Sequence, residues 1–485
     1  MIQRIPIRPL RDWIDQNTYL LLRMAVVAAV LLVTLFIARR PSLLYLGLLA
    51  GLGAFLVLMR RPVLGLAGII IGGLVVPVGI GTGSESEINP PMLIIVVLVA
   101  LWLLDMIRRH EIKLMPSRTN LPLIVLLVGA LLSLGVGQLN WFMTSGAPIR
   151  AQLGGLAIYV LSVAVFFLTR YLVREQSWLE RLVWIFLALG AVYIAGRIVG
   201  PIGEVTGRLF TTSSAGSLFW TWLVALSFSQ AVYNKRLRPF WRASLLFLTG
   251  AVLFVGMTYD LGWTSGWAPA VAAIGVILLV GSPRLGIVLV VIGVIGFLVI
   301  PQLGPDLFSV GDNSYSALTR VAAWRILLQI VEVSPILGLG PANYYFYTPL
   351  FSILGYYVRF NSHNNYVDLV AQLGVVGLAC FLWFCAETGI VGWRLRRVVE
   401  DGFSRAYVYA ALGGLAGMLV AAMFGDWVLP FVYNIGFAGF RASVLGWLFL
   451  GGLAALEQIY RAGNAQPEVQ AQSTARPAVL PIGNE

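Results

Sequence analysis

Residues 121–140 read LPLIVLLVGALLSLGVGQLN, twenty positions without a charged side chain. An α-helix rises about 1.5 Å per residue, so about 20 apolar residues cross the hydrocarbon core of a bilayer. In lipid, every backbone N–H and C=O group needs a partner within the protein, which favours a helix for such a segment. These residues therefore predict a transmembrane helix.

Apolar segments of similar length recur along almost the whole chain, for example at Tyr19–Ala38 and Trp178–Gly200, with a shorter one at Leu285–Ile300. Of the 485 residues, 59% are hydrophobic and 11% are charged, whereas about 25% are charged in soluble domains. The apolar runs are continuous, while a membrane β-barrel would alternate. We therefore predict an all-α, polytopic membrane helix bundle.

Fourteen segments meet the length criterion, a few of them marginally, and we expect about 12 to 14 of them to span the membrane. The candidate spans lie near residues 19–38, 42–59, 63–82, 91–107, 121–140, 152–173, 179–199, 216–233, 243–259, 266–281, 285–301, 366–390, 406–424 and 437–456.

The net charge of +12 comes from short basic clusters between the spans. With the N-terminus in the cytoplasm, 23 of the 33 Lys and Arg residues lie inside, nine lie outside and Arg23 lies within the first span. The main exception is Arg39–Arg40, which this arrangement places outside. The distribution follows the positive-inside rule of membrane proteins. It predicts a multi-pass protein of the cytoplasmic (inner) membrane that contacts lipid and binds no nucleic acid.

The same pattern predicts five regions along the chain. Residues 1–18 form a basic cytoplasmic N-terminus, followed by a first span too long for a cleaved signal. A transmembrane bundle covers 19–301, a large extracytoplasmic loop covers 302–365, and the C-terminal transmembrane helices cover 366–456. The polar residues 457–485 predict a disordered cytoplasmic tail.

Metal and nucleotide sites have little support in the sequence. Cys380 and Cys385 lie five residues apart within one apolar span, on different faces of a helix, which predicts neither a disulfide nor a metal site. Glu85 and Glu87 are the only close acidic pair outside, and a flexible Glu-x-Glu is a weak metal site. Walker-type, nucleophile-elbow and zinc motifs are absent from the sequence. We expect no metal and no cofactor.

The predicted loop at 302–365 is long enough to be functional, because most connections in compact bundles are under about fifteen residues. Within it, Ser316–Val333 predicts an amphipathic helix that could lie on the membrane surface. Its apolar positions recur at three and four residues: Ala317, Val321, Trp324, Leu327, Leu328 and Val331. A Gly-Pro turn at 337–341 and a Tyr/Phe-rich stretch to Tyr357 follow, and the loop ends in RFNSHNNY at 359–366.

His363, one of two histidines, is the candidate catalytic residue of this loop. Capping the helix that begins near Tyr366 is about as good an explanation as a role as general base. Two features favour function: amide and hydroxyl side chains surround His363, and the chain re-enters the membrane beside it. Asp368 is near enough to orient the imidazole, although five residues along a helix is poor geometry.

Four outside arginines form the second candidate feature: Arg208, Arg320, Arg325 and Arg359. A guanidinium binds phosphate well because its planar fork can contact two oxygens at once. A single interfacial Arg more often anchors a helix to lipid headgroups. Several arginines on one loop indicate an anionic ligand.

These segments together resemble the O-antigen ligase and O-antigen polymerase superfamily of bacterial membrane glycosyltransferases. The resemblance covers roughly residues 316–385. It is carried by the segments RVAAWR at 320–325, PILGLG at 335–340, YYF at 344–346, SHNNY at 362–366 and LGVVGL at 373–378. A fainter similarity at GRLFTT, 207–212, lacks the Pro-Asn that is usual there, which makes the role of Arg208 less secure.

The resemblance implies transfer of a glycan from undecaprenyl pyrophosphate to an acceptor hydroxyl, such as that of a lipid A core, on the outer face of the cytoplasmic membrane. It implies that Arg320 and Arg208 bind the pyrophosphate, assisted by Arg325 or Arg359. His363 would act as general base or orient the hydroxyl, in a metal-independent, inverting displacement. The supporting residues would be Asn361, Asn364, Asn365, Gly338 and Gly340.

Two groups of alternatives stay open. Within the superfamily, a polymerase uses a second lipid-linked repeat as acceptor, and a protein O-oligosaccharyltransferase uses a serine or threonine. The short His-Asn-Asn stretch and the single long loop favour a ligase. Outside the superfamily, a small-anion transporter would have a similar number of spans. A transporter would carry ionisable or Gly/Pro-broken spans near the membrane midplane, whereas Asp105 and Glu387 lie near span ends.

Overall fold

The computed structural model describes residues 17–20, 23–24, 27, 43–81, 87–111, 115–210, 216–260, 263–299 and 314–474. The chain divides into two units, 1–61 and 62–485. In the first unit, α2 (Leu43–Arg60) matches the second predicted span. The predicted first span, near 19–38, lies largely outside the described residues.

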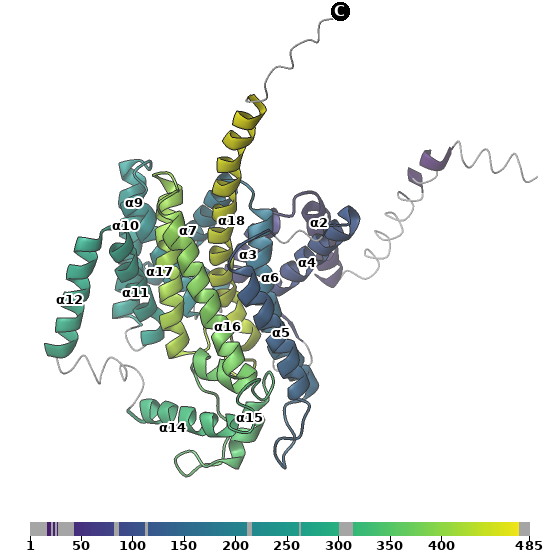
Figure 1. The fold of residues 1–485 in the computed structure, drawn as a ribbon, viewed down its shortest axis with the longest axis vertical. Helices are drawn as coiled ribbons and strands as arrows, with labels where there is room; N and C mark the ends of the chain where they lie inside the picture. The colour runs from purple at the N-terminus through teal and green to yellow at the C-terminus, as the bar shows by residue number, and fades with distance from the viewer. Residues whose placement is uncertain are drawn as a thin grey trace, which may run out of the picture. The chain divides into compact units, whose positions relative to one another are not determined.

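The second unit is built almost entirely of helices, which Figure 1 labels. They are α3 (Leu64–Leu74), α4 (Pro90–Arg109), α5 (Asn120–Val136), α6 (Ile149–Leu172), α7 (Gln176–Ile198), α8 (Gly200–Leu209), α9 (Ser217–Tyr233), α10 (Pro239–Thr258), α11 (Thr264–Gly281), α12 (Pro283–Val299), α14 (Ser314–Val331), α15 (Tyr344–Tyr347), the short 3-10 turn η1 (Thr348–Leu350), α16 (Asn365–Leu395), α17 (Phe403–Phe424) and α18 (Gly436–Thr474).

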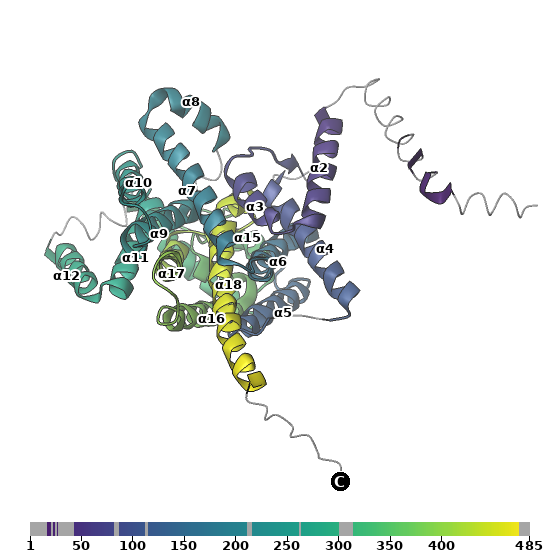
Figure 2. The same ribbon diagram turned by 90° about the horizontal axis from the view of Figure 1, so that it is seen from above.

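Eight of the described helices are long and apolar enough to cross a membrane: α4, α6, α7, α10, α11, α16, α17 and α18. This confirms the predicted all-α, multi-pass membrane fold. The helix α18 packs against α6 and α17, and α16 packs against α5 and α17 (Figure 1). Figure 2 shows α18 in the middle of the second unit. The most apolar stretch of this helix, within Gly436–Ala462, is completely buried. The rings of Phe384 and Trp447, 5.3 Å apart, stack in this core.

Three boundaries differ from the sequence prediction. The helix α3 ends at Leu74, well before residue 82, because the chain turns into a two-stranded antiparallel pair, β1 (Ile80–Gly81) and β2 (Glu87–Ile88). After α7, the chain forms the extra short helix α8. Where a disordered tail is predicted from residue 457, α18 continues as a helix to Thr474, and residues 475–485 lie outside the described residues.

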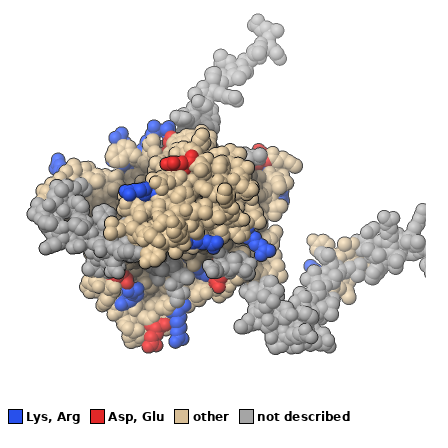
Figure 3. All heavy atoms as spheres, turned by 90° about the horizontal axis from the view of Figure 1, so that it is seen from below, with Lys and Arg blue, Asp and Glu red and all other residues tan. Residues whose placement is uncertain are grey.

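The predicted amphipathic helix is confirmed as α14, which Figure 1 shows lying across the direction of α16 and α17. We call this end of the bundle the loop end. One side of α14 is buried in an apolar cluster made of Leu327, Ile330, Val331, Leu339, Tyr344, Tyr347, Ala371 and Phe431. Leu318, Val321 and Leu328 on the opposite side are 64%, 49% and 51% exposed, as expected of a helix at a lipid surface. In its described part, the face seen in Figure 3 carries scattered charges and no continuous basic area.

A kink in α16 anchors the loop to the bundle. Gly374 interrupts this helix with a positive φ of 68°, a conformation that favours glycine. The backbone of 335–340 runs beside the kink: Leu339 N donates to Ala371 O (3.0 Å), and Val375 N donates to Pro335 O (2.9 Å). Gly338 also has a positive φ, and a Cβ there would overlap the Gln372 carbonyl group. The glycine-rich turn is therefore a backbone-to-backbone anchor.

We predict that Gly374→Ala destabilises the protein by about 1–3 kcal/mol, the usual cost of a strained backbone. The new Cβ would in addition overlap the carbonyl oxygen of Ile336. Thermal unfolding of the detergent-purified protein measures the effect. Gly389→Ala in the same helix is the matched control, because a Cβ there meets only Leu415 at 3.8 Å. Equal melting temperatures for the two variants would contradict the anchoring role of the kink.

Candidate functional site

His363 lies at a strained point where the loop enters α16. Its φ is +48°, a left-handed conformation that costs energy for a residue with a side chain. Hydrogen bonds on both sides hold this backbone in place. Asn364 caps the helix, since its Oδ1 accepts from Tyr366 N at 2.9 Å, and Asn364 N donates to Ser362 Oγ at 2.9 Å. The His363 side chain is left exposed.

A buried carboxylate fixes the other side of the motif. Asp368 Oδ1 accepts from Ser362 Oγ (2.7 Å) and from the Tyr344 hydroxyl (2.5 Å). Burial, together with the charge of Asp368, raises the pKa of Tyr344 well above its ordinary value, so Tyr344 stays a donor. No hydrogen bond between Asp368 and His363 is found among the described residues. Asp368 positions the loop rather than the imidazole.

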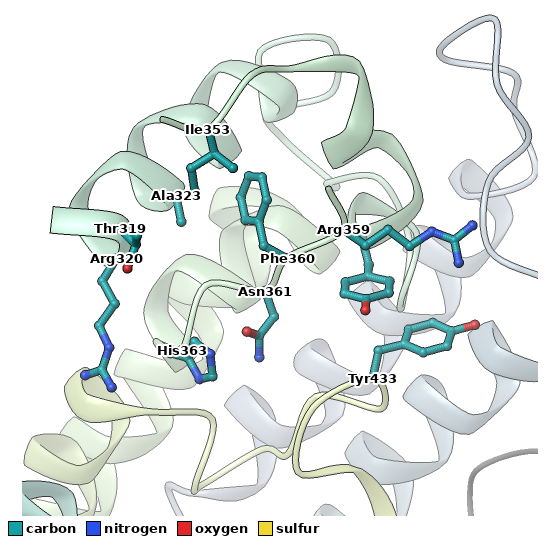
Figure 4. A pocket seen from close by; sticks show the side chains of 10 residues that line it. Thr319, Arg320, Ala323, Ile353, Arg359, Phe360, Asn361, His363 and Tyr433 are labelled. Atoms are coloured by element: carbon teal, nitrogen blue, oxygen red, sulfur yellow. The ribbon is translucent and has the colours of Figure 1, made fainter. Parts of the chain in front are cut away.

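The helix α14 is tied directly to this motif. Trp324 Nε1 donates to the carbonyl oxygen of Ser362 at 2.7 Å. Arg320 lies one turn earlier on the same helix, and Figure 4 shows it and His363 on one side of the same hollow. The contact explains why an arginine about forty residues away in sequence lies near the histidine.

The imidazole contacts the connection between α17 and α18, which the sequence did not indicate. Asn434 Nδ2 lies 3.3 Å from His363 Nδ1 and donates to Asp426 Oδ1 at 2.6 Å. Asp426 is fully buried, and its Oδ2 accepts from Phe431 N at 2.6 Å. Burial raises the pKa of Asp426 to about 6, although these two N–H donors lower it. The two N–H donors on its oxygens favour the charged form of Asp426.

This chain of contacts selects a tautomer of His363. A charged carboxylate only accepts hydrogen bonds, so the amide nitrogen of Asn434, not its oxygen, faces Asp426. The second hydrogen of the same nitrogen then points to His363 Nδ1, which must accept it. The neutral imidazole consequently carries its proton on Nε2.

Asn365 places the α17–α18 connection against α16. Its Oδ1 accepts from Val428 N (2.9 Å), and its Nδ2 donates to Leu429 O (2.8 Å). Residues that follow α17 are thereby brought to the start of α16. The signal available in the sequence was Asp426, the one acidic residue of the short connection 425–435.

A cavity of about 290 Å³ opens beside His363. It is lined by Thr319, Arg320, Ala323, Tyr345, Ile353, Arg359, Phe360, Asn361, His363 and Tyr433, most of which Figure 4 labels. In that view Arg320 and Arg359 lie on opposite sides. The Arg359 guanidinium lies 4.2 Å from the ring centre of Phe346, a cation–π contact.

The cavity gathers only some of the predicted site residues. His363, Arg320, Arg359 and Asn361 line it. Arg325 is exposed on α14, and Arg208 is exposed near the end of α8; neither lines the cavity. Asn364, Asn365, Gly338 and Gly340 hold the backbone around the site, the last by donating to Gln372 O at 3.0 Å.

Among the residues that the structure describes, no three His, Cys, Asp or Glu side chains are close enough to hold a metal ion. Glu87 lies in β2, and its predicted partner Glu85 lies outside the described residues. Cys380 and Cys385 are buried and free.

A comparison with known protein families matches part of this region. A family model described as O-Antigen ligase matches residues 249–382, which include α14, the loop and the first part of α16. The match confirms the resemblance to the superfamily of ligase- and polymerase-like membrane glycosyltransferases. A search among curated proteins found no significant match.

We predict that ¹⁵N-histidine NMR of a His110→Gln variant, which has His363 as its only histidine, shows the neutral ring protonated at Nε2. Asn434→Asp should move that proton to Nδ1, because a carboxylate accepts where the amide donates. Asn140→Asp, at an exposed position outside the site, is the matched control and should leave the spectrum unchanged. A ring protonated at Nδ1 in the parent protein would contradict the assigned tautomer.

Proposed function

We propose that this protein is an O-antigen ligase-like glycosyltransferase. It would move a glycan from undecaprenyl pyrophosphate to a hydroxyl of an acceptor, such as a lipid A core, on the outer face of the cytoplasmic membrane. The observation that carries the proposal is the cavity that joins Arg320 to His363, within and beside the segment that matches the O-antigen ligase model. A cation and an imidazole across one small cavity suit an anionic leaving group and a hydroxyl nucleophile.

Arg320 would bind the pyrophosphate. As the bond between the sugar C1 and the phosphate oxygen breaks, negative charge grows on that oxygen, and a fixed guanidinium stabilises it more in the transition state than in the ground state. Arg208, from α8, stays a second candidate for the same group, as does Arg325. Arg359 is the weaker candidate, since it stacks on Phe346 across the cavity from Arg320.

His363 would orient the acceptor hydroxyl. With the proton on Nε2, the imidazole donates a hydrogen bond there and holds the nucleophilic oxygen in line with the breaking bond. The oxygen bonds to C1 from the face opposite the pyrophosphate, which inverts the anomeric centre. The hydroxyl proton is released to water as the bond to C1 forms, and the pyrophosphate leaves as an anion beside Arg320. The role of general base would need the other tautomer, with the Asn434 amide turned over and Asp426 protonated.

The membrane supplies the donor. The exposed apolar side of α14, with Leu318, Val321 and Leu328, lies beside the cavity and suits contact with a polyprenyl chain or with lipid. Polymerase or protein O-oligosaccharyltransferase activity would use the same donor side with a different acceptor. For a small-anion transporter the structure offers less support, because Asp105 and Glu387 are paired with Arg109 and Arg118.

We predict that Arg320→Ala lowers the rate of glycan transfer by about 10²–10³, as for other donors that stabilise a developing anion. His363→Ala should cause a comparable loss. The measurement uses the purified protein with an undecaprenyl-pyrophosphate glycan and a lipid A core acceptor. Arg150→Ala, at an exposed position outside the cavity, is the control. Wild-type rates for both site variants would refute the assignment, and anion uptake by proteoliposomes without any lipid donor would favour transport.

We also predict that transfer continues in excess EDTA, because Arg320 supplies the positive charge that the pyrophosphate needs. The chelator is added to protein already freed of divalent cations by dialysis. Loss of activity that returns with Mg²⁺ or Mn²⁺ would contradict the metal-independent mechanism.

A further inference from the structure

Asn361 differs from the other amides of the motif. The side chains of Asn364 and Asn365 are used in hydrogen bonds to the backbone. Asn361 is only 8% exposed and lines the cavity, yet its amide nitrogen has no hydrogen-bond partner among the described residues. Among the asparagines of the motif, Asn361 is therefore the one with a buried amide nitrogen that makes no hydrogen bond to the described part of the protein.

The free energy of this arrangement points to a ligand. An unpartnered buried polar group destabilises a fold by about 1–3 kcal/mol, and a purely structural position would be filled at lower cost by leucine. A ligand oxygen in the cavity supplies the missing hydrogen bond.

The cavity beside Asn361 is aromatic. In Figure 4 the Asn361 amide lies between His363 and Tyr433. Tyr433 and Tyr345 both line the cavity, with their rings 4.9 Å apart and 9° from parallel. Phe360 and Ile353 also line the cavity. The cationic Arg320 lies on the opposite side of His363 from Tyr433 in this view.

A ligand for this part of the cavity needs polar edges and an apolar face. A pyranose ring has both: hydroxyls around its rim, and C–H groups that the negative face of an aromatic ring attracts. About 290 Å³ is near the lower limit of ligand pockets, roughly 300 Å³, and suits one sugar ring rather than a chain. The arginine on this side of the cavity, Arg359, is stacked on Phe346.

We propose that the space between His363 and Tyr433 is a subsite for one pyranose unit, bonded through a hydroxyl to the Asn361 amide and packed on the tyrosine pair. This rests on the proposed glycosyl transfer, and the sugar is either the first unit of the donor or the terminal unit of the acceptor. Asn361 is then a residue that sets sugar specificity, while Arg320 binds the pyrophosphate.

The test is saturation-transfer NMR on the full-length protein in detergent. The probes are the methyl glycosides of glucose, galactose, mannose and N-acetylglucosamine, and inorganic pyrophosphate is titrated separately. The variants are Asn361→Leu and Tyr433→Leu, with Asn140→Leu as the exposed control. We expect at least one glycoside to bind the wild type and the control. Asn361→Leu should weaken it about three- to tenfold, as for one lost hydrogen bond, with the pyrophosphate affinity unchanged.

Three results would overturn the subsite. In the first, the wild type binds none of the glycosides. In the second, Asn361→Leu binds the glycoside as tightly as the wild type does. In the third, Asn361→Leu has a lower melting temperature than the wild type, which would show that the amide is structural. Displacement of the glycoside by undecaprenyl pyrophosphoryl N-acetylglucosamine, but not by undecaprenyl pyrophosphate, assigns the sugar to the donor. Persistent binding beside that donor assigns it to the acceptor. Sugar binding without any glycan transfer would leave the subsite standing and refute the proposed reaction.

Discussion

A single buried carboxylate, Asp368 at the start of α16, holds the loop end of this protein together. It accepts hydrogen bonds from Tyr344 and Ser362, and so it joins the aromatic part of the loop, the histidine motif and a membrane helix. Removing an acidic side chain from water costs free energy, and the two hydrogen bonds to Oδ1 offset part of that cost. Because Ser362 is fixed, its carbonyl oxygen is available to Trp324, and α14 is positioned in turn.

The site is assembled from three segments far apart in the chain: α14, the entry to α16 and the α17–α18 connection. Each is fixed by hydrogen bonds between a side chain and the backbone. Trp324 holds the first, the helix cap of Asn364 holds the second, and the backbone bonds of Asn365 hold the third. The strained backbone at His363 persists because these contacts over-determine it. A histidine held in one position suits a reaction that depends more on the alignment of the reacting groups than on acid–base strength.

The sequence predicted most of the fold and some of the residues that form the site. Continuous apolar runs identify membrane helices whatever their neighbours, and the three-and-four spacing located α14 within two residues. His363 and Arg320 stood out because their chemistry is rare on that loop. Asp426 and Asn434 did not, since their importance depends on a contact 71 residues away along the chain. Asp368, considered as the partner of His363, bonds Ser362 and Tyr344 instead.

By itself, then, the sequence determined that the chain crosses a membrane repeatedly and that a histidine and several arginines share one long loop. Those features follow from composition and periodicity, which act locally. Tertiary structure decided which arginine lies near the histidine. Arg320 and Arg325 are on the same helix, and the way α14 packs places Arg320 in the cavity lining and leaves Arg325 exposed. It also decided the tautomer of His363 and left the Asn361 amide nitrogen without a partner among the described residues, since both depend on how segments far apart in the chain pack together.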